Sequence, residues 1–325
     1  MKNSAKYSSE AAEVSSRELE IPLECAGLRL DRALAALLPE HSRSCLQSWL
    51  KEGRITLDGE QPGASRKVWG GERLCLREPP PDTELAEQPE AIALDVLHED
   101  DSILVLNKPA GLVVHPGSGN WSGTLLNALL HHDPALEALP RAGIVHRLDK
   151  ETSGLMVVAR TEMAREALVA QLQARSVARH YLALVHGRVL ADGLVDAPIG
   201  RHPISRTKMA VQPEGREART HYSVQERFGE AVTRLECRLE TGRTHQIRVH
   251  MASLGHPLVG DPVYGKRRCG DALLDAFPRQ ALHAFRLGLL HPEGARPLQW
   301  EAPPPEDLAE LLAQLRARAG SGGRE

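Results

Sequence analysis

The chain has 325 residues, of which 42% are hydrophobic and 26% charged, and its formal net charge is −3. This length is enough for one large domain with a smaller one. No run of about 18 apolar residues occurs, and the polar N-terminus lacks the apolar core of a secretory signal, so we expect neither a membrane span nor secretion. The five cysteines are scattered without a Cys-x-x-Cys pair, which favours a reduced, cytoplasmic protein without disulfides.

Charge is distributed unevenly along the chain. Residues 81–101 contain eight acidic residues and no Lys or Arg, whereas residues 141–190 contain eight Lys or Arg and four acidic residues. Residues 201–250 contain ten basic and six acidic residues. A local basic face can bind phosphate even on a protein whose net charge is slightly negative. The alternative is that these arginines only form a solvated surface.

The N-terminal region predicts a tail followed by a compact unit. Residues 1–18 are polar and are expected to be a disordered tail. Residues 19–77 contain two helical patterns and a short strand that ends at an Asp-Gly turn. The expected elements are a helix over Leu28–Leu38, a helix over Arg43–Glu52 with Ser42 as its N-cap, and a strand over Arg54–Leu57.

A second, larger domain follows a linker. Residues 78–91 are acidic and rich in proline, which predicts an extended linker, and residues 92–318 predict the large domain, with a disordered tail over 319–325. Its expected helices are Glu162–Ala174, with Thr161 as N-cap, and Pro305–Arg318, and its expected strands are Ile103–Asn107, Leu155–Ala159, Tyr181–Val185, Ala231–Glu240 and Gln246–His250. Strands in runs with few helices between them predict an α+β fold with a mixed, largely antiparallel sheet and flanking helices.

The segment His146–Ala159, HRLDKETSGLMVVA, is the most informative stretch of the chain. Asp149 lies in a polar turn next to Arg147 and a lysine, and Leu155–Ala159 is typical of a strand. Residues 143–145 predict the end of another strand, so the pattern is strand, short loop, strand. A carboxylate flanked by cations at the edge of a sheet stays ionised and close to any polyanion that binds there. A surface ion pair or a turn-forming role for Asp149 is the alternative.

HRLDKETSG resembles the active-site signature of the RluA-type family of pseudouridine synthases. Further blocks resemble the family in the same order, over about residues 19–312. They are NKPAGLVVHPGSGN (Asn107–Asn120), RHYLALVHG (Arg179–Gly187), ETGRTHQIRVHMA (Glu240–Ala252), HPLVGDPVYG (His256–Gly265) and RQALHA (Arg279–Ala284). The resemblance implies a long mixed sheet crossed by an RNA-binding cleft. It also implies cofactor-free isomerisation of uridines in large-subunit (23S) ribosomal RNA to pseudouridine.

Residues 19–77 resemble an S4 RNA-binding domain, through the order RLDRAL, SRS and KEGRITLDG. The resemblance implies that cations on its two helices contact RNA phosphates. The expected RNA-binding residues of this unit are Arg29, Arg32, Arg43, Lys51 and Arg54. A small adaptor domain with ordinary solvated charges is the alternative.

Pseudouridine formation breaks the N1–C1′ bond, turns the uracil and joins C5 to C1′, so it needs a nucleophile or base and a later acceptor for the C5 proton. Asp149 is the candidate nucleophile by its position in the motif. Attack at C1′, attack at C6 and removal of the C2′ proton all remain open. By resemblance, Arg147 takes the place of the extruded base in the RNA stack.

Tyr181 and Arg248 complete the expected catalytic set. Tyr181 is expected to stack on the flipped uracil and to help remove the C5 proton, although its spacing alone favours an ordinary core aromatic. Arg248 alternates with Ile247 and Val249 in QIRVH, which predicts a strand that points the arginine away from those two side chains. By resemblance Arg248 pairs with Asp149, and a strand-surface arginine is the alternative.

Three patterns argue poorly for a cofactor or a metal. A glycine-rich segment is one residue off the dinucleotide fingerprint and predicts a flexible loop. His245 and His250 lie five apart on a predicted strand and therefore face opposite sides. The pair His131 and His132 has no acid cluster near it. The glycine-rich segment contains Gly117, Gly119 and Gly123. We therefore expect no cofactor and no metal.

Three other functions remain as alternatives. The chain could modify another RNA, such as tRNA, or act as a non-catalytic S4-type ribosome-assembly factor, which the intact Asp149, Tyr181 and Arg248 disfavour. A glycoside hydrolase would need a second acid in a similar setting, and the nearest one, Glu151, is typical of a loop surface. The expected partner is ribosomal RNA, free or within a large-subunit assembly intermediate, and we expect a monomer.

Overall fold

The computed structural model describes residues 16–41, 43–77, 86, 88–117, 120–205, 208–265 and 268–321, without the side chains of residues 44, 320 and 321. The chain divides into two units, residues 1–85 and residues 86–325. Each unit is described by itself. The predicted N-cap Ser42 and most of the predicted tail and linker lie outside the described residues.

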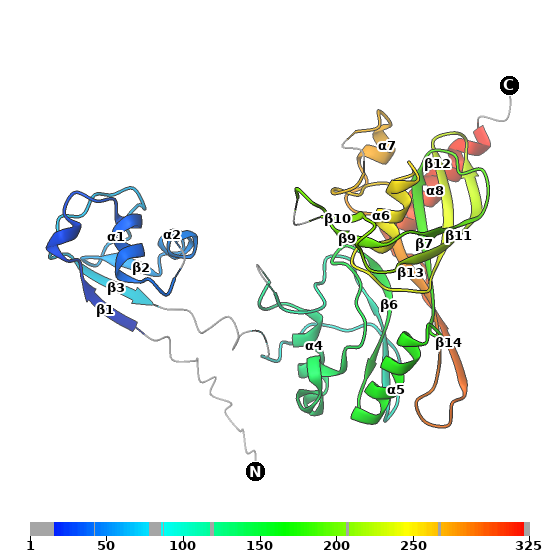
Figure 1. The fold of residues 1–325 in the computed structure, drawn as a ribbon, viewed down its shortest axis with the longest axis horizontal. Helices are drawn as coiled ribbons and strands as arrows, with labels where there is room; N and C mark the ends of the chain where they lie inside the picture. The colour runs from blue at the N-terminus through cyan, green and yellow to red at the C-terminus, as the bar shows by residue number, and fades with distance from the viewer. Residues whose placement is uncertain are drawn as a thin grey trace, which may run out of the picture. The chain divides into compact units, whose positions relative to one another are not determined.

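The first unit packs two helices against a small antiparallel sheet (Figure 1). The helices α1 (Leu30–Leu37) and α2 (Arg43–Lys51) lie within two residues of the predicted ones. The sheet has the strand order β1-β3-β2, and a short 3₁₀ helix, η1 (Leu23–Cys25), precedes α1. The strands are β1 (Ser16–Glu20), β2 (Ile55–Leu57) and β3 (Arg73–Arg77). The strand β1 begins inside the predicted tail and is exposed along most of its length, so it lacks the alternation that reveals a strand in a sequence.

The large unit is built on a mixed sheet of nine strands, which confirms the predicted α+β class (Figure 1). Its order is β4-β5-β6-β13-β7-β12-β11-β8, with β14 paired to β13. The pairing of β6 with β13 is parallel, and the other described pairs are antiparallel. The strands are β4 (Val96–Glu99), β5 (Ile103–Lys108), β6 (Ser153–Ala159), β7 (Ala178–His186), β8 (Gly193–Asp196), β11 (Arg219–Phe228), β12 (Val232–Leu239), β13 (Leu282–Leu290) and β14 (Pro297–Glu301). A separate hairpin joins β9 (Ile199–Arg201) to β10 (Met209–Val211).

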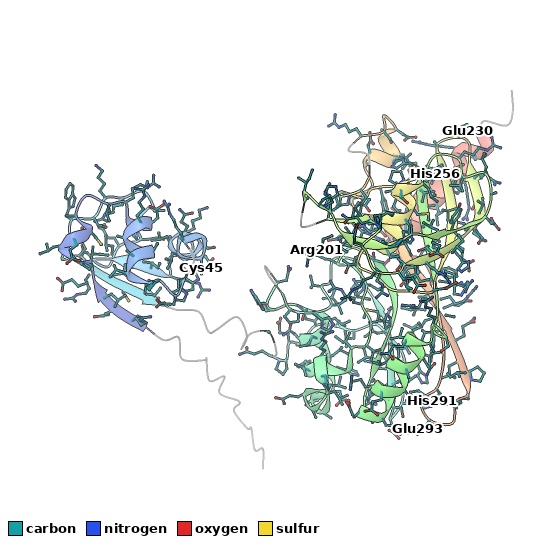
Figure 2. All side chains as sticks on the ribbon, in the orientation of Figure 1. Cys45, Arg201, Glu230, His256, His291 and Glu293 are labelled. Carbon is teal, nitrogen blue, oxygen red and sulfur yellow. The ribbon has the colours of Figure 1, made fainter. Side chains whose placement is uncertain are left out.

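Helices cover the sheet where its side chains are apolar. The helix α4 (Leu125–His132) begins at Thr124 with a capping box, and its leucines join the largest core with side chains from β5, β6 and β7. The helix α5 (Glu162–Gln173) has the predicted N-cap Thr161 and packs on β6. The C-terminal helix α8 (Glu306–Ser321) covers a third cluster with the short α7 (Ala272–Asp275). Turns between strands lie at opposite ends of the unit, at Glu230 and at His291 to Glu293 (Figure 2).

Two predicted strands are wrong, and both lie beside the site described below. Residues 143–145 do not end a strand, because η3 (Pro140–Gly143) occupies this position and only Ile144 makes a single bridge, to Val158. Gly143 has φ +74°, and a side chain there would meet the carbonyl oxygen of Ala159. The backbone therefore turns sharply against β6 instead of extending.

The second wrong strand is Gln246–His250, which is the first part of the helix α6 (Gln246–Ser253). All six residues from Gln246 to Met251 are buried. A short helix that is buried on every side shows no helical period, and its alternating apolar residues imitate a strand. Because the segment is helical, the argument that placed Arg248 on the opposite face from Ile247 and Val249 does not hold.

Candidate active site

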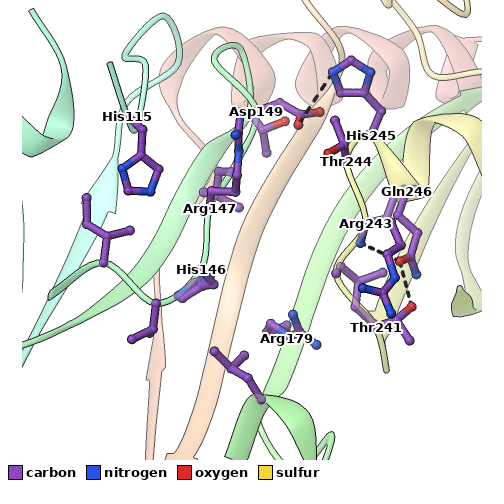
Figure 3. Close-up of a pocket in the computed structure, with 18 of the residues that line it drawn as sticks. His115, His146, Arg147, Asp149, Arg179, Thr241, Arg243, Thr244, His245 and Gln246 are labelled. Carbon is purple, nitrogen blue, oxygen red and sulfur yellow. Dashed lines mark hydrogen bonds and ion pairs between the residues drawn. The ribbon is translucent and has the colours of Figure 1, made fainter. Parts of the chain in front are cut away.

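A cavity of about 930 Å³ opens in the large unit (Figure 3). Its walls come from the loop that follows η3, from the start of β7 and from the segment that leads into α6. Six arginines and two carboxylates, those of Asp149 and Glu240, line it. Glu240 is already paired, since Oε1 contacts His221 and Oε2 lies 3.6 Å from Arg175. The excess of cations favours a polyanionic ligand.

The loop that carries Asp149 is held by a buried lysine. Lys108, the last residue of β5, donates from Nζ to the carbonyl oxygens of Pro109, Leu112 and Lys150, at 2.7, 2.9 and 3.0 Å. Burial lowers the pKa of Lys108 to about 7, against the opposing charge of the nearby carboxylates. Three carbonyl acceptors satisfy all three ammonium donors and fix the loop to β5.

An arginine holds the same loop from the C-terminal end of the chain. Arg279 donates from Nη1 to the carbonyl oxygen of Glu151 at 3.1 Å. Its Nε and Nη2 form a bidentate pair with Asp307 in α8, at 2.6 and 2.9 Å. Gln280 adds a hydrogen bond to Thr152 Oγ1 at 3.2 Å. The loop around Asp149 is thus fixed by segments that lie far before and far after it in the sequence.

Asp149, Arg248 and Asp261 form one ion-pair chain. Nη1 of Arg248 donates to Oδ2 of Asp149 at 3.0 Å, while its Nε and Nη2 donate to Asp261 at 2.7 and 3.0 Å. The side chain of Asp261 is 0% exposed, that of Arg248 5% and that of Asp149 17%. The predicted contact between Arg248 and Asp149 is therefore present, although a helix and not a strand supplies the arginine.

Electrostatics keep Arg248 and Asp261 ionised although both are buried. Burial alone would lower the pKa of Arg248, but its hydrogen bond to Asp261 and the charges of Asp261 and Asp149 raise it. Burial likewise opposes ionisation of Asp261, and Arg248 nevertheless lowers the pKa of that carboxyl. Asp261 also accepts the amides of Val263 and Tyr264, at 2.8 and 3.0 Å. The more exposed carboxylate, Asp149, faces the cavity with a cation fixed behind it.

Asp261, Tyr264 and His245 had no predicted role. Tyr264 lies against the guanidinium of Arg248, 5.1 Å from ring centroid to Cζ, and its hydroxyl is 2.9 Å from Nδ1 of His245. The other ring nitrogen of His245 is 4.0 Å from Oδ1 of Asp149 (Figure 3). A signal for them exists in the sequence, because these residues fall in the blocks THQIRVH and HPLVGDPVYG, where polar residues interrupt an apolar pattern.

Tyr181 lies on β7 in the middle of the sheet and lines the same cavity as Asp149. Its partners in register are Cys237 of β12 and Ala284 of β13. Burial raises the pKa of the Tyr181 hydroxyl, the charge of Arg179 opposes this rise, and the charge of Asp149 adds to it. The hydroxyl is therefore protonated near neutral pH, which suits a proton donor or a group that is activated only during reaction.

Arg147 lines the cavity with an exposed side chain, as does Arg141. No carboxylate among the described residues pairs with either of them. Arg141 belongs to a left-handed turn, with φ +57°, followed by Ala142 at +50°. Arg179 lies deeper, and burial lowers its pKa. Cations without a protein partner are available to phosphate groups.

The five cations predicted to bind RNA in the first unit fall into three groups. Arg29 and Arg43 contact one fully buried carboxylate, Asp31, at 3.2 and 2.6 Å, and each stays about half exposed. The hydrogen bond from Arg43 lowers the pKa of Asp31 to about 2, although burial opposes this. Arg54 pairs with Glu52 at 2.7 Å, whereas Arg32 and Lys51 are exposed. Asp31 thus orders two of these cations before any ligand arrives.

Among the described residues, no three His, Cys, Asp or Glu side chains form a cluster that could hold a metal ion. His250 is buried in α6 and contacts Thr220 and the carbonyl oxygen of Ala197. Gly119 lies outside the described residues, so the glycine-rich segment is described only in part. Glu151 does not line the cavity, so it is not the second acid that a glycosidase needs, and the other carboxylate in the wall, Glu240, is paired with His221 and Arg175.

Within the described part of the chain, no helix combines the length and apolar character that a membrane span requires. The family described as RNA pseudouridylate synthase matches residues 102–253. This range includes Asp149, Tyr181 and Arg248. It ends before Asp261.

Several curated proteins are similar over nearly the whole chain, and each is named ribosomal large subunit pseudouridine synthase D. The one from Nitrosomonas europaea is 56% identical, over 92% of this chain and 88% of its own. Those from Xanthomonas campestris pv. campestris and Neisseria meningitidis serogroup B are 54% and 51% identical. They cover 95% and 98% of this chain, and 95% and 88% of their own lengths.

Solved structures support the fold. Human RNA pseudouridylate synthase domain containing 1 is 27% identical with a TM-score of 0.53, and it covers 71% of this chain and 98% of its own. Human RNA pseudouridylate synthase domain containing 4 is 26% identical with a TM-score of 0.55, and it covers 68% and 93%. With relatives above 50% identity along almost the full length and the site residues in one cavity, the chain belongs to the family of RNA pseudouridine synthases.

Proposed function

We propose that this enzyme converts uridines of large-subunit ribosomal RNA to pseudouridine, with Asp149 as the nucleophile. One observation carries the assignment of Asp149. Its carboxylate is the partly exposed end of an ion-pair chain, with Arg248 at 3.0 Å and the buried Asp261 behind it. A carboxylate that contacts a fixed arginine at the wall of a cationic cavity can act on a ribose or base that RNA brings there.

The chemistry balances without a cofactor. The N1–C1′ bond breaks, the uracil turns, the C5–C1′ bond forms, and the proton that C5 loses is replaced by one on the freed nitrogen. Asp149 can act by attack at C1′, by attack at C6 or by removal of the C2′ proton. Tyr181, whose hydroxyl is protonated, is proposed to stack on the uracil and to take part in the C5 proton transfer.

Access to a paired or stacked uridine requires that the base leaves its stack, which costs a few kcal/mol. Arg147 is exposed on the same loop as Asp149, and we assign to it the place that the extruded base vacates. A planar guanidinium can stack on neighbouring bases and hydrogen-bond at the same time. Arg141 and Arg179 add positive charge to the cavity for the phosphates next to the target.

The first unit is proposed to be an S4-type RNA-binding domain. Asp31 fixes Arg29 and Arg43 while both remain half exposed, and Arg32 and Lys51 add exposed charge. Ordered arginines lose less side-chain entropy when they bind phosphate than free ones. We expect this unit to hold structured ribosomal RNA, free or in a large-subunit assembly intermediate, for a monomeric enzyme that acts in the cytoplasm.

The substrate and the nucleophile are tested together by mapping pseudouridines in ribosomal RNA. Cells that lack the protein are compared with cells that carry the wild type, Asp149→Asn or Glu151→Gln. Glu151→Gln is the matched control, because this acid is two residues from Asp149 and does not line the cavity. We expect specific large-subunit positions to lose pseudouridine without the protein, and only the wild type and Glu151→Gln to restore them. Losses confined to tRNA would refute the ribosomal substrate, and restoration by Asp149→Asn would refute the nucleophile.

A further inference from the structure

His245 stands between Asp149 and Tyr264 in the cavity, and the chemistry above leaves it without a task. Its Nε2 is 4.0 Å from Oδ1 of Asp149, and its Nδ1 is 2.9 Å from the hydroxyl of Tyr264. Arg248 contacts the other oxygen of the same carboxylate, Oδ2. The two oxygens of Asp149 therefore face two different partners, a permanent cation and an imidazole. Figure 3 shows the contact with the imidazole.

The backbone of His245 is unusual for its residue type. With φ +57° and ψ +22° it is left-handed, although it has a side chain, and it precedes α6 without a side-chain cap. Such conformations are costly for residues with a side chain and persist where the surroundings impose them. The left-handed turn starts α6 and directs the imidazole into the cavity, where His245 is one of the lining residues.

The hydrogen bonds of Tyr264 determine which ring nitrogen of His245 carries the proton. The amide of Met209 donates to the Tyr264 hydroxyl at 2.8 Å, so the hydroxyl is free to donate its own proton to Nδ1 of His245. This arrangement leaves the ring proton on Nε2, which faces the negative Oδ1 of Asp149. Burial lowers the pKa of His245, which keeps the imidazole neutral, and burial raises the pKa of Tyr264, which keeps its hydroxyl protonated.

We propose that His245 is a positioning residue of the reaction: supported by Tyr264, it presents Nε2–H to Oδ1 of Asp149 and fixes the rotation of the nucleophilic carboxylate. The inference rests on the proposed role of Asp149. A distance of 4.0 Å is too long for a hydrogen bond, so the proposal requires the contact to shorten by about 1 Å when RNA fills the cavity. A carboxylate held at both oxygens keeps one orientation toward the ribose, which a single contact to Arg248 does not ensure.

Three variants separate this role from a structural one. Asparagine tolerates the left-handed backbone, but its amide is too short to reach Oδ1, so His245→Asn keeps the fold and removes the donor. His245→Gln returns a donor at about the position of Nε2. Tyr264→Phe keeps the ring against Arg248 and removes the hydroxyl, and Tyr222→Phe, which loses a hydroxyl outside this cavity, is the control.

The test is single-turnover release of tritium from RNA with uridine tritiated at C5, measured over a range of enzyme concentrations. We expect His245→Asn to lower the maximal rate by about tenfold or more, with half-saturation changed by less than about twofold, and His245→Gln to recover at least part of that loss. Tyr264→Phe alone should lower the maximal rate. Combined with His245→Asn it should lower the rate little further, because both changes remove the same contact. Tyr222→Phe should leave the rate unchanged.

Two results would overturn the proposal. One is a His245→Asn enzyme within about twofold of the wild-type rate, and the other is a loss of rate matched by an equal loss of RNA affinity, with Gln no better than Asn. Asp149→Asn in the same assay separates this inference from the proposed function. If that variant turns over, the role of Asp149 itself fails, whereas an inactive Asp149→Asn beside an unimpaired His245→Asn removes only the role of His245.

Discussion

Arg248 and Asp149 lie 99 positions apart in the sequence, and Nη1 of the arginine is 3.0 Å from Oδ2 of the carboxylate. The other two guanidinium nitrogens, Nε and Nη2, are committed to Asp261. The cation behind Asp149, the proposed nucleophile, therefore has one orientation, set by a carboxylate that is fully buried. Catalysis should depend on the direction of this guanidinium as well as on its charge.

Arg248→Lys tests that dependence. A lysine keeps the charge but cannot contact both carboxylates with fixed geometry, so single-turnover rates should fall roughly 100-fold. Arg316→Lys, which alters an exposed pair with Glu226, is the control and should be neutral. Arg248→Ala should also lower the free energy of unfolding, by about 3–5 kcal/mol, because it leaves the buried charge of Asp261 without its cation. Wild-type turnover by Arg248→Lys would mean that the directed ion pair is unimportant.

Tyr181→Phe separates stacking from proton transfer. The ring remains, so RNA affinity should be nearly unchanged, whereas loss of the hydroxyl should slow product formation by about 10²–10⁴-fold. Tyr181→Leu should also weaken binding of the flipped base, by about 1–3 kcal/mol. Product formation and affinity are measured for both variants, with Tyr222→Phe as the control. If Tyr181→Phe forms pseudouridine at the normal rate, the hydroxyl takes no part and only a stacking role survives.

Deletion of residues 1–80 tests the first unit as an RNA anchor. The large unit has its own core, so it should remain folded and retain some activity at high enzyme concentration. Affinity for structured ribosomal RNA should fall, and the slope of log affinity against log salt should drop by about 0.7–0.9 for each phosphate that the shortened enzyme no longer binds. Arg32→Glu in the full chain should lower the affinity for structured ribosomal RNA and the salt slope by less than the deletion does. Unchanged affinity and slope after the deletion would exclude the unit as an anchor.

His146 should make the large unit sensitive to acid. Its Nε2 accepts the amide of Val157 at 3.0 Å, which requires the neutral ring, and burial lowers its pKa to about 3. The unfolded chain binds a proton below its ordinary pKa near 6.5 and the folded chain does not, so this contribution to stability falls as pH drops from about 6.5 toward 3. Allowing for partial exposure, we expect a loss of about 1–2 kcal/mol by about pH 4.5. Denaturant unfolding of wild type and His146→Gln, which keeps an acceptor and cannot titrate, should diverge over this range. Parallel curves would contradict the prediction.

Sequence patterns predicted the elements of this fold that carry a clear local apolar signal. The helix after the Thr161 cap was found because one side of it is apolar, and the strand after Asp149 was found because it is a short continuous run of apolar residues, which is typical of a strand buried on both faces. The strand β1, exposed on both faces, and the helix α6, buried on all sides, carry no such contrast and were missed or wrong. Asp149 and Arg248 were named from motifs, and the contact between them is present. Asp261 and Tyr264 reach the site only because the segment after α6 folds back against the guanidinium of Arg248. This tertiary contact leaves no pattern in the local sequence.

The attachment of Arg279 to both Glu151 and Asp307 has a consequence for the order of events during synthesis. The strand and loop that carry Asp149 emerge from the ribosome long before α8, yet one of the supports of that loop is paired with the first turn of α8. Domains form from the N-terminus as the chain grows, so more than 150 further residues must be synthesised before the last support of the loop around Asp149 is present. We expect a nascent chain to bind RNA before it can modify it, and an enzyme cut just before Asp307 to behave like that unfinished chain.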